Sequence, residues 1–121
     1  MDIEEPKRET KLVLLVPYFR NRVIALLDRM KARGFDPVVF ETRRSKKRQQ
    51  YLYWIGRRIQ KNRKPVTWTM NSRHNVGKAV DIISGEYGWN DKAFFDALAE
   101  EANIQGLHVI STERCHVQWE G

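Results

Sequence analysis

The order of short apolar segments limits the possible folds of this chain more than any other feature of its sequence. Apolar side chains at three- and four-residue spacing follow Pro17 and predict an amphipathic helix over residues 18–33, with Gly34 just beyond its end. Residues 37–40 then form a short β-rich run. Because the connections between such segments are too short for a crossover helix at every step, we predict an α+β fold with a small, mainly antiparallel sheet and about three helices.

The remaining segments predict elements of both kinds. Ser45 is suited to cap a second helix over residues 45–61, and Asn90 or Asp91 is suited to cap a third helix that ends before Gly106. The rest of the chain is predicted as strands at residues 66–70 and 79–83, turns at residues 71–78, and one or two short strands within residues 107–119. The polar residues 1–11 are expected to form a loose or lightly docked tail.

Length and composition exclude two classes of protein. The chain has 121 residues, 41% of them hydrophobic, so we expect one domain, residues 1–121, with a real core. Its single cysteine, Cys115, excludes a disulfide-stapled secreted mini-protein. The longest apolar run, residues 12–17, is far shorter than the ~20 residues of a membrane-spanning helix, and the layout of a signal peptide is missing. We therefore expect a protein that is made in the cytoplasm without a signal peptide and has no stable membrane insertion.

The excess positive charge lies in one segment. The formal net charge is +7, and residues 41–64 hold 10 basic residues and 1 acidic residue. Such a segment attracts polyanions, whether nucleic acid, anionic lipid or a negatively charged cell wall, although a solvated helix face has the same composition. One alternative function is therefore a basic nucleic-acid-binding module, in which helix 45–61 follows phosphates and Tyr51, Tyr53 and Trp54 stack on bases.

The most informative chemistry lies between Ser72 and Asp81. His74 and Asp81 are seven residues apart around Gly77, and a fully extended chain would hold them ~23 Å apart. Two ligands of one metal each lie within ~2 Å of it, so a shared site needs a turn between them, which Asn75 and Gly77 permit. Asp81 is expected to face away from the core, because its neighbours on the strand point to the other face.

Glu113 and His116 add a second carboxylate and a second imidazole near the end of the chain. Two histidines, an aspartate and a further carboxylate are the inventory of a catalytic zinc site, in which three ligands leave one position for water and a carboxylate removes its proton. On a regular strand, positions 113 and 116 face opposite ways, so Glu113 is expected in a bend before the strand that carries His116. We expect Cys115 to be a buried thiol that points away from this face, and His108 to be an ordinary strand or surface histidine.

Three stretches together resemble the M15 zinc peptidases, the group of D-alanyl-D-alanine carboxypeptidases and phage L-alanyl-D-glutamate endopeptidases. Residues 72–81 match every fixed position of the signature S-x-H-x-x-G-x-A-x-D, and residues 113–116 resemble the later acidic-x-x-His element. Upstream, the stretch that begins Glu41-Thr-Arg-Arg44-Ser45 is similar to the pattern E-G-x-R-S…R-Q…L-Y…G-R. The resemblance covers about residues 17–121 and implies a Hedgehog/D-Ala-D-Ala-peptidase-like fold.

The resemblance also implies a role for each residue of the site. It would place one zinc ion per chain on three ligands, His74, Asp81 and His116. Glu113 would be the general base that activates water. Arg44 would stabilise the oxyanion or hold a substrate carboxylate, a task that suits its planar fork, and Ser72 would line the substrate site.

The implied function is hydrolysis of an amide bond in the peptide stems of bacterial peptidoglycan. The missing signal peptide and the compact chain favour a phage or prophage endolysin of L-alanyl-D-glutamate endopeptidase type, a monomer that acts at the cell wall after release and binds no nucleic acid. Glu113 stands where many phage enzymes of the group have aspartate, whereas the carboxypeptidase branch has glutamate. D-alanyl-D-alanine carboxypeptidase therefore stays open as the alternative.

Overall fold

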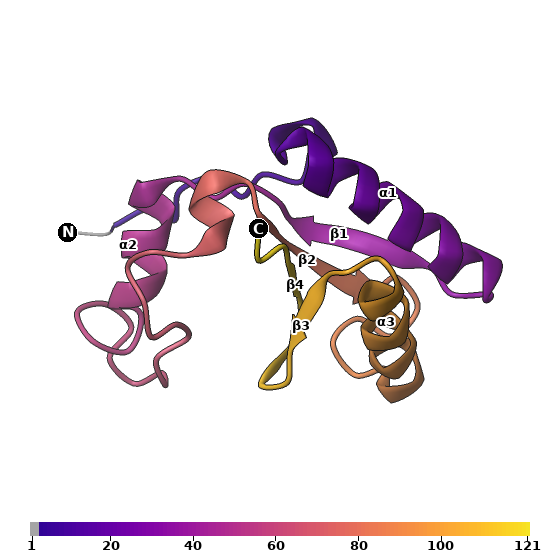
Figure 1. The fold of residues 1–121 in the computed structure, drawn as a ribbon. Helices are drawn as coiled ribbons and strands as arrows, with labels where there is room; N and C mark the ends of the chain where they lie inside the picture. Colours follow the sequence, from indigo (N-terminus) through magenta and orange to yellow (C-terminus); the bar gives the residue numbers. More distant parts are fainter. Residues whose placement is uncertain (1–2) are drawn as a thin grey trace.

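The computed structural model describes residues 3–121, and across this range the strands form one antiparallel sheet of four strands (Figure 1). The strands are β1 (Pro37–Glu41), β2 (Ala79–Ser84), β3 (His108–Ile110) and β4 (Glu113–Gln118). Their order in the sheet is β1-β2-β4-β3, and each neighbouring pair is antiparallel. The predicted α+β fold is confirmed, as are the strands expected near residues 37–40 and 79–83 and at the end of the chain.

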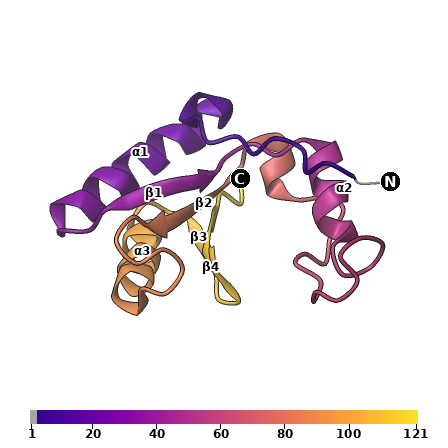
Figure 2. The ribbon, with the colours of Figure 1, turned by 180° about the vertical axis from the view of Figure 1, so that it is seen from behind.

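Two helices pack on one face of this sheet. α1 (Pro17–Ala32) begins with proline in its first turn, and its predicted extent is confirmed within a residue. α3 (Lys92–Ile104) begins after Asp91, whose side chain accepts a hydrogen bond from a backbone N–H of the first turn at 3.0 Å. Both helices end close to a glycine with positive φ, Gly34 and Gly106. Seen from behind, α1 runs alongside β1 (Figure 2).

The hydrophobic core lies between these helices and the sheet. Its fully buried side chains come from both helices and from the central strand, and include Phe19, Leu26, Met30, Val80, Ile82, Phe94 and Leu98. Burial of each such side chain contributes about 1.5–3 kcal/mol. Since Val80 and Ile82 occupy the core face of β2, Asp81 between them points to the opposite face, as the strand period predicts.

The second helix is shorter than predicted. α2 (Lys46–Trp54) begins at the expected N-cap, because Ser45 Oγ accepts a hydrogen bond from the Arg48 amide at 3.0 Å. The prediction that this helix continues to residue 61 is wrong. Gly56 has φ +80, and a Cβ there would lie 2.6 Å from the carbonyl oxygen of Arg63, so the chain folds back tightly on itself after α2.

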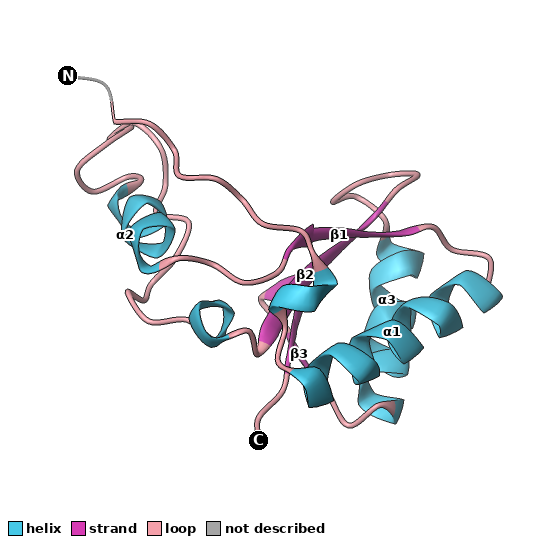
Figure 3. Ribbon diagram, turned by 90° about the horizontal axis from the view of Figure 1, so that it is seen from above, coloured by secondary structure: helices cyan, strands magenta, loops and turns pink. Residues whose placement is uncertain are grey.

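The strand predicted at residues 66–70 is also wrong, because this stretch is an irregular loop. Its carbonyl groups accept from side chains instead of from a neighbouring strand. Thr67 O accepts from Arg57 Nη1 at 2.9 Å, and Thr69 O accepts from Gln49 Nε2 at 2.7 Å. Seen from above, α2 lies on one side of the sheet, with α1 and α3 on the other (Figure 3).

The N-terminal residues 3–11 are docked onto the domain rather than loose. They contain no helix or strand, but the Thr42 amide donates a hydrogen bond to the Glu9 carbonyl at 2.7 Å. Two 3₁₀ turns complete the described elements, η1 (Leu12–Leu14) and η2 (Arg73–Val76). From residue 3 onward, no helix combines the length and the apolar character that crossing a bilayer requires.

Candidate metal centre and active site

A short 3₁₀ turn positions His74. Ser72 caps η2, since its Oγ accepts from the His74 amide at 3.2 Å and its own amide donates to the Asn75 side chain at 2.8 Å. Gly77 then adopts the left-handed conformation with φ +71, and a Cβ there would lie 2.8 Å from a carbonyl oxygen of η1. This turn reverses the chain, so that His74 Nε2 lies 3.2 Å from Oδ1 of Asp81.

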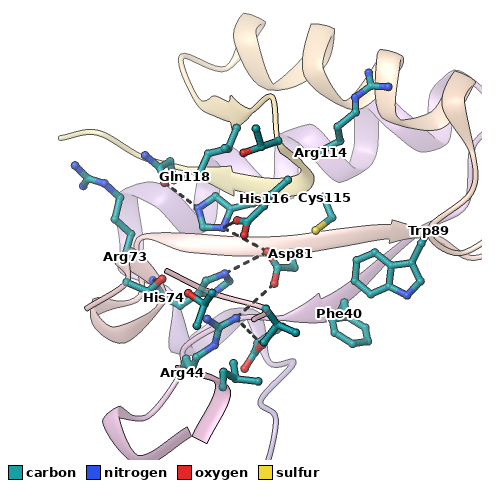
Figure 4. A pocket seen from close by; sticks show the side chains of 18 of the residues that line it. Phe40, Arg44, Arg73, His74, Asp81, Trp89, Arg114, Cys115, His116 and Gln118 are labelled. Carbon is teal, nitrogen blue, oxygen red and sulfur yellow. Dashed lines mark hydrogen bonds and ion pairs between the residues drawn. The ribbon is translucent and has the colours of Figure 1, made fainter. Parts of the chain in front are cut away.

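The pairing of β2 with β4 brings in the second histidine. Asp81 and His116 lie opposite each other in the antiparallel register, and His116 Nδ1 is 3.5 Å from Asp81 Oδ1. The ring centroids of His74 and His116 are 5.0 Å apart, and the rings are nearly perpendicular, at 81°. All three side chains are buried and converge on one point (Figure 4). The structure thus brings together the three residues that the sequence proposes as metal ligands.

Each histidine is oriented by a hydrogen bond at its outer ring nitrogen. His74 Nδ1 lies 2.7 Å from the Thr42 carbonyl oxygen, and His116 Nε2 lies 2.8 Å from Oε1 of Gln118. Both partners are oxygens that accept, so these nitrogens carry the protons. In the neutral ring, the other nitrogen of each histidine then carries the lone pair, and that nitrogen faces Asp81.

The three donor groups fit a divalent metal ion. One nitrogen of each histidine and one oxygen of Asp81 lie within 4.8 Å of one another, and no other such group of three is found among residues 3–121. Two imidazoles and a carboxylate are a ligand set typical of catalytic zinc. Hydrogen bonds from the outer ring nitrogens to oxygen acceptors are the supporting contacts that metal-ligating histidines make.

The electrostatics of the group also suit a cation. Burial alone would raise the pKa of Asp81, but its contacts with His116 and His74 hold that pKa well below its usual range. Burial favours the neutral ring of His116, whereas the neighbouring Asp81 carboxylate raises the pKa of His116 above its ordinary value. An ionised carboxylate therefore faces two imidazoles, and a bound cation would compete with a proton for His116.

Glu113 reaches the same group through an irregularity in β4. Val109 pairs with Val117, but the next residue of β3, Ile110, pairs with Glu113, so β4 bulges between the two pairs. Glu113 is thus the first residue of β4, and the prediction that it lies in a bend before the strand is corrected. On a regular strand, the side chains of residues 113 and 116 would face opposite ways, and the bulge allows both to lie on the same face. Oε2 of Glu113 lies 3.9 Å from His116 Nδ1, and the side chain is 52% exposed.

Arg44 lies on the other side of Asp81, within a buried network. Its Nη2 is 3.6 Å from Asp81 Oδ2 and donates to Glu41 at 2.8 Å. Its Nη1 donates to Gln49 at 2.8 Å, and Arg48 binds the second oxygen of Glu41 at 2.6 Å. Burial opposes ionisation of Glu41, but the two guanidinium groups hold its pKa below its ordinary value. Nε of Arg44 is buried and has no partner within the described chain, whereas Nη2 is the nitrogen that lies beside Asp81 at the site.

The other residues singled out in the sequence lie around this group. Ser72 lines the cleft while its oxygen caps the turn before His74. Cys115 packs partly against the core and lies outside the donor group, and burial together with two nearby carboxylates raises the pKa of its thiol. His108 is an exposed residue at the start of β3.

Two residues that orient the histidines were not identified from the sequence. Thr42 acts through its backbone carbonyl, so its side chain gives no signal. Gln118 lies two residues after His116 on the same face of β4, and the two-residue period of a strand would have identified it.

The site opens into a cleft of about 1250 Å³ between the sheet and α2. One wall is α2 and the loop after it, including Trp68. The opposite wall is the β3–β4 turn and the first residues of β4, Glu113 and Arg114. Phe40 and Trp89 also line it, packed edge to face with ring centroids 4.8 Å apart (Figure 4). Because small-molecule sites typically measure about 300–1,000 Å³, this cleft has room for a segment of a polymer.

Comparison with known proteins adds the family. A family model described as D-alanyl-D-alanine carboxypeptidase, VanY, matches residues 13–118. Among curated proteins, none matches this chain.

Solved structures share the fold. VanYB in complex with D-alanine-D-alanine has a TM-score of 0.71 at 19% identity, over 88% of this chain and 72% of that one. The Serratia marcescens L-Ala D-Glu endopeptidase ChiX has a TM-score of 0.65 at 23% identity, over 97% of this chain and 92% of that one. The vancomycin-resistance D,D-pentapeptidase VanY in complex with Zn(II) has a TM-score of 0.65 at 20% identity, over 88% of this chain and 73% of that one.

An antiparallel sheet that carries Asp81 and His116, with His74 on the adjoining η2 turn, at the floor of a cleft is the arrangement of a metallopeptidase. The chain belongs to the VanY family of D-alanyl-D-alanine carboxypeptidases, whose model matches most of its length. The family membership and the peptidase class that the sequence motifs indicate are thereby confirmed.

Proposed function

We propose that this protein is a zinc-dependent peptidase that hydrolyses an amide bond in the stem peptides of bacterial peptidoglycan. The observation that carries the proposal is the buried group of His74, Asp81 and His116 at the floor of a cleft. The similar structures support it, since one holds D-alanine-D-alanine and another holds Zn(II). When bound, zinc supplies a Lewis acid that polarises a carbonyl and lowers the pKa of water.

The side chains around the ligands handle protons and charge. Glu113 accepts a proton from the attacking water and passes it to the leaving amine, because it is exposed to the cleft and lies beside His116. Arg44 stabilises the negative oxygen of the tetrahedral intermediate, since its guanidinium lines the cleft beside Asp81 and is held in place by Gln49 and Glu41. Ser72 lines the substrate site beside His74.

Within this class we propose cleavage between L-alanine and D-glutamate by a monomeric phage or prophage endolysin. The extent of the structural match supports the bond, because 97% of this chain matches the L-Ala D-Glu endopeptidase and 88% matches VanYB. The cationic segment supports action at an anionic cell wall. The alternative hypothesis is a D-alanyl-D-alanine carboxypeptidase. The description of the family model favours it. The position of Arg44 beside Asp81 also favours it, because a guanidinium can bind the terminal carboxylate of a peptide.

Digestion of purified peptidoglycan, followed by mass spectrometry of the products, distinguishes the two bonds. An L-alanyl-D-glutamate endopeptidase releases peptides that begin with D-glutamate, whereas a carboxypeptidase only removes terminal D-alanine. Glu113→Gln is expected to keep zinc but to lose activity by about 100-fold or more. His74→Ala is expected to lose both, and Glu86→Gln, an exposed change outside the cleft lining, is the matched control. Full activity of Glu113→Gln would refute the assigned mechanism.

The alternative of a nucleic-acid-binding module is less favoured, because the aromatic residues of α2 are buried or partly buried. Tyr51 is 7% exposed. The guanidinium of Arg57 lies over the Tyr53 ring at 4.0 Å. Burial of Tyr51 and the guanidinium over one face of Tyr53 leave little aromatic surface on which bases could stack. Binding of oligonucleotides at physiological salt without a metal would favour this alternative.

A further inference from the structure

The segment before η1 contacts the residue that orients His74. We call residues 5–9 the N-terminal strap. The carbonyl oxygen of Glu9 accepts hydrogen bonds from Thr42 N at 2.7 Å and from Thr42 Oγ1 at 3.1 Å. The carbonyl oxygen of the same Thr42 accepts from His74 Nδ1 at 2.7 Å. The strap and the histidine therefore hold one residue from two sides.

The first residues of the strap contact the network that orients Arg44. Arg48 is 4% exposed, and its Nη1 donates to the Pro6 carbonyl at 3.1 Å and lies 3.5 Å from the Glu5 carboxylate. Nε of Arg48 binds Glu41 at 2.6 Å, and Glu41 accepts from Arg44 at 2.8 Å. The strap thus closes the outer side of this network.

The middle of the strap packs on the wall of the cleft. The guanidinium of Arg8 lies 3.7 Å from the centroid of the Phe40 ring, and Phe40 in turn packs against Trp89. By contrast, the side chains of Lys7 and Glu9 pair with each other at 3.8 Å and make none of these contacts. The strap therefore has four anchors, which are two backbone carbonyls, one stacked guanidinium and the Glu5 carboxylate beside Arg48.

We propose that the N-terminal strap is a positioning element of the active site. It fixes the carbonyl that orients His74 and the ion pairs that orient Arg44, and this inference rests on the proposed function of both residues. Within the described chain, the core between the helices and the sheet contains no strap residue. Partners that orient metal-ligating histidines typically change metal affinity or activity by about 10–100-fold.

Deletion of residues 2–10 tests the proposal, with zinc affinity as the first readout. We expect the zinc affinity, measured by competition with a chromogenic chelator, to fall about tenfold or more. At saturating zinc, kcat on a soluble stem peptide should fall while KM changes little, because Arg44 is no longer held against Glu41. Deletion of residues 2–4, which lie before the strap, is the matched control and should leave both quantities unchanged.

A second measurement needs no variant. Coupling is reciprocal, so a strap that strengthens zinc binding must itself be held more firmly by zinc. The Thr42 amide, which donates to Glu9, reports opening of the strap through its hydrogen exchange. Zinc should slow this exchange in the full chain by the factor that the deletion loses in affinity, with the Leu26 amide of α1 as the reference for global unfolding.

The outcomes separate the two proposals. Unchanged zinc affinity in the deletion variant, or a Thr42 amide whose exchange does not respond to zinc, overturns the positioning role. If the deletion variant does not fold, the exchange measurement decides. A full chain that binds zinc with a responsive strap but cleaves no stem peptide refutes the proposed function alone.

Discussion

Replacement of Arg48 by methionine is expected to lower the free energy of unfolding by about 3 kcal/mol at neutral pH. The side chains of Arg48 and Glu41 are 5% and 2% exposed, and Nε lies 2.6 Å from Oε2. Without Arg48, Glu41 would be a buried carboxylate with one guanidinium, that of Arg44, instead of two. Removal of one member of a buried ion pair typically costs about 3–5 kcal/mol. Because Arg44 still pairs with Glu41 in the variant, we expect a loss at the lower end of this range.

A loss of this size is measurable, because a domain of this kind is typically stable by about 5–15 kcal/mol. The corresponding fall in the midpoint of thermal unfolding is about 10 °C. Urea unfolding followed by circular dichroism gives the free energy directly. Arg58→Met is the matched control, since Arg58 is exposed and forms no ion pair with the described residues, and it should change stability by less than about 0.5 kcal/mol.

The loss should also depend on pH. Although burial opposes its ionisation, Glu41 has a lowered pKa because Arg44 and Arg48 stabilise its charged form. Its ionised form therefore stabilises the fold above its ordinary pKa of 4.5, and this contribution disappears as the pH falls through the lowered value. The difference between the original chain and Arg48→Met should shrink accordingly in acid. A loss below about 1 kcal/mol at neutral pH, or one that stays constant in acid, would refute the reasoning.

Three further predictions follow from other parts of the structure. In urea unfolding, Gly77→Ala should lower the free energy of unfolding more than Gly106→Ala. Both glycines have positive φ, but only at Gly77 would a Cβ meet a backbone oxygen, at 2.8 Å. Equal losses for the two variants would contradict this reasoning. Cys115→Ser should leave zinc affinity unchanged, and the original thiol, whose pKa is raised by burial, should react slowly with thiol reagents near neutral pH. The rate of cleavage of intact peptidoglycan should fall as salt is raised to about 0.5 M. Lys47→Glu should lower this rate more than it lowers the rate of cleavage of a soluble stem peptide. Equal effects on the two substrates would show that the cationic segment has no part in wall binding.

The elements that the sequence predicted correctly are those with local signals. α1 has a proline at its start, apolar side chains at helical spacing and a glycine after its end, and α3 has a capping aspartate. Each signal acts between residues that are a few positions apart, so it is present in the sequence before the chain folds. The errors lie where distant groups decide. α2 ends early because Gly56 approaches the backbone of Arg63, and the predicted strand at residues 66–70 fails because Arg57 and Gln49 bind its carbonyls.

The sequence by itself determined which chemical groups are available, and that the chain turns between His74 and Asp81. The tertiary structure alone decided the register that sets Asp81 opposite His116, the bulge that turns Glu113 toward them, and the docking of the N-terminal strap on Thr42. The physical reason is the range of the interactions. A cap or a turn depends on neighbours along the chain, whereas register, bulges and docking depend on contacts between segments that meet only in the folded state.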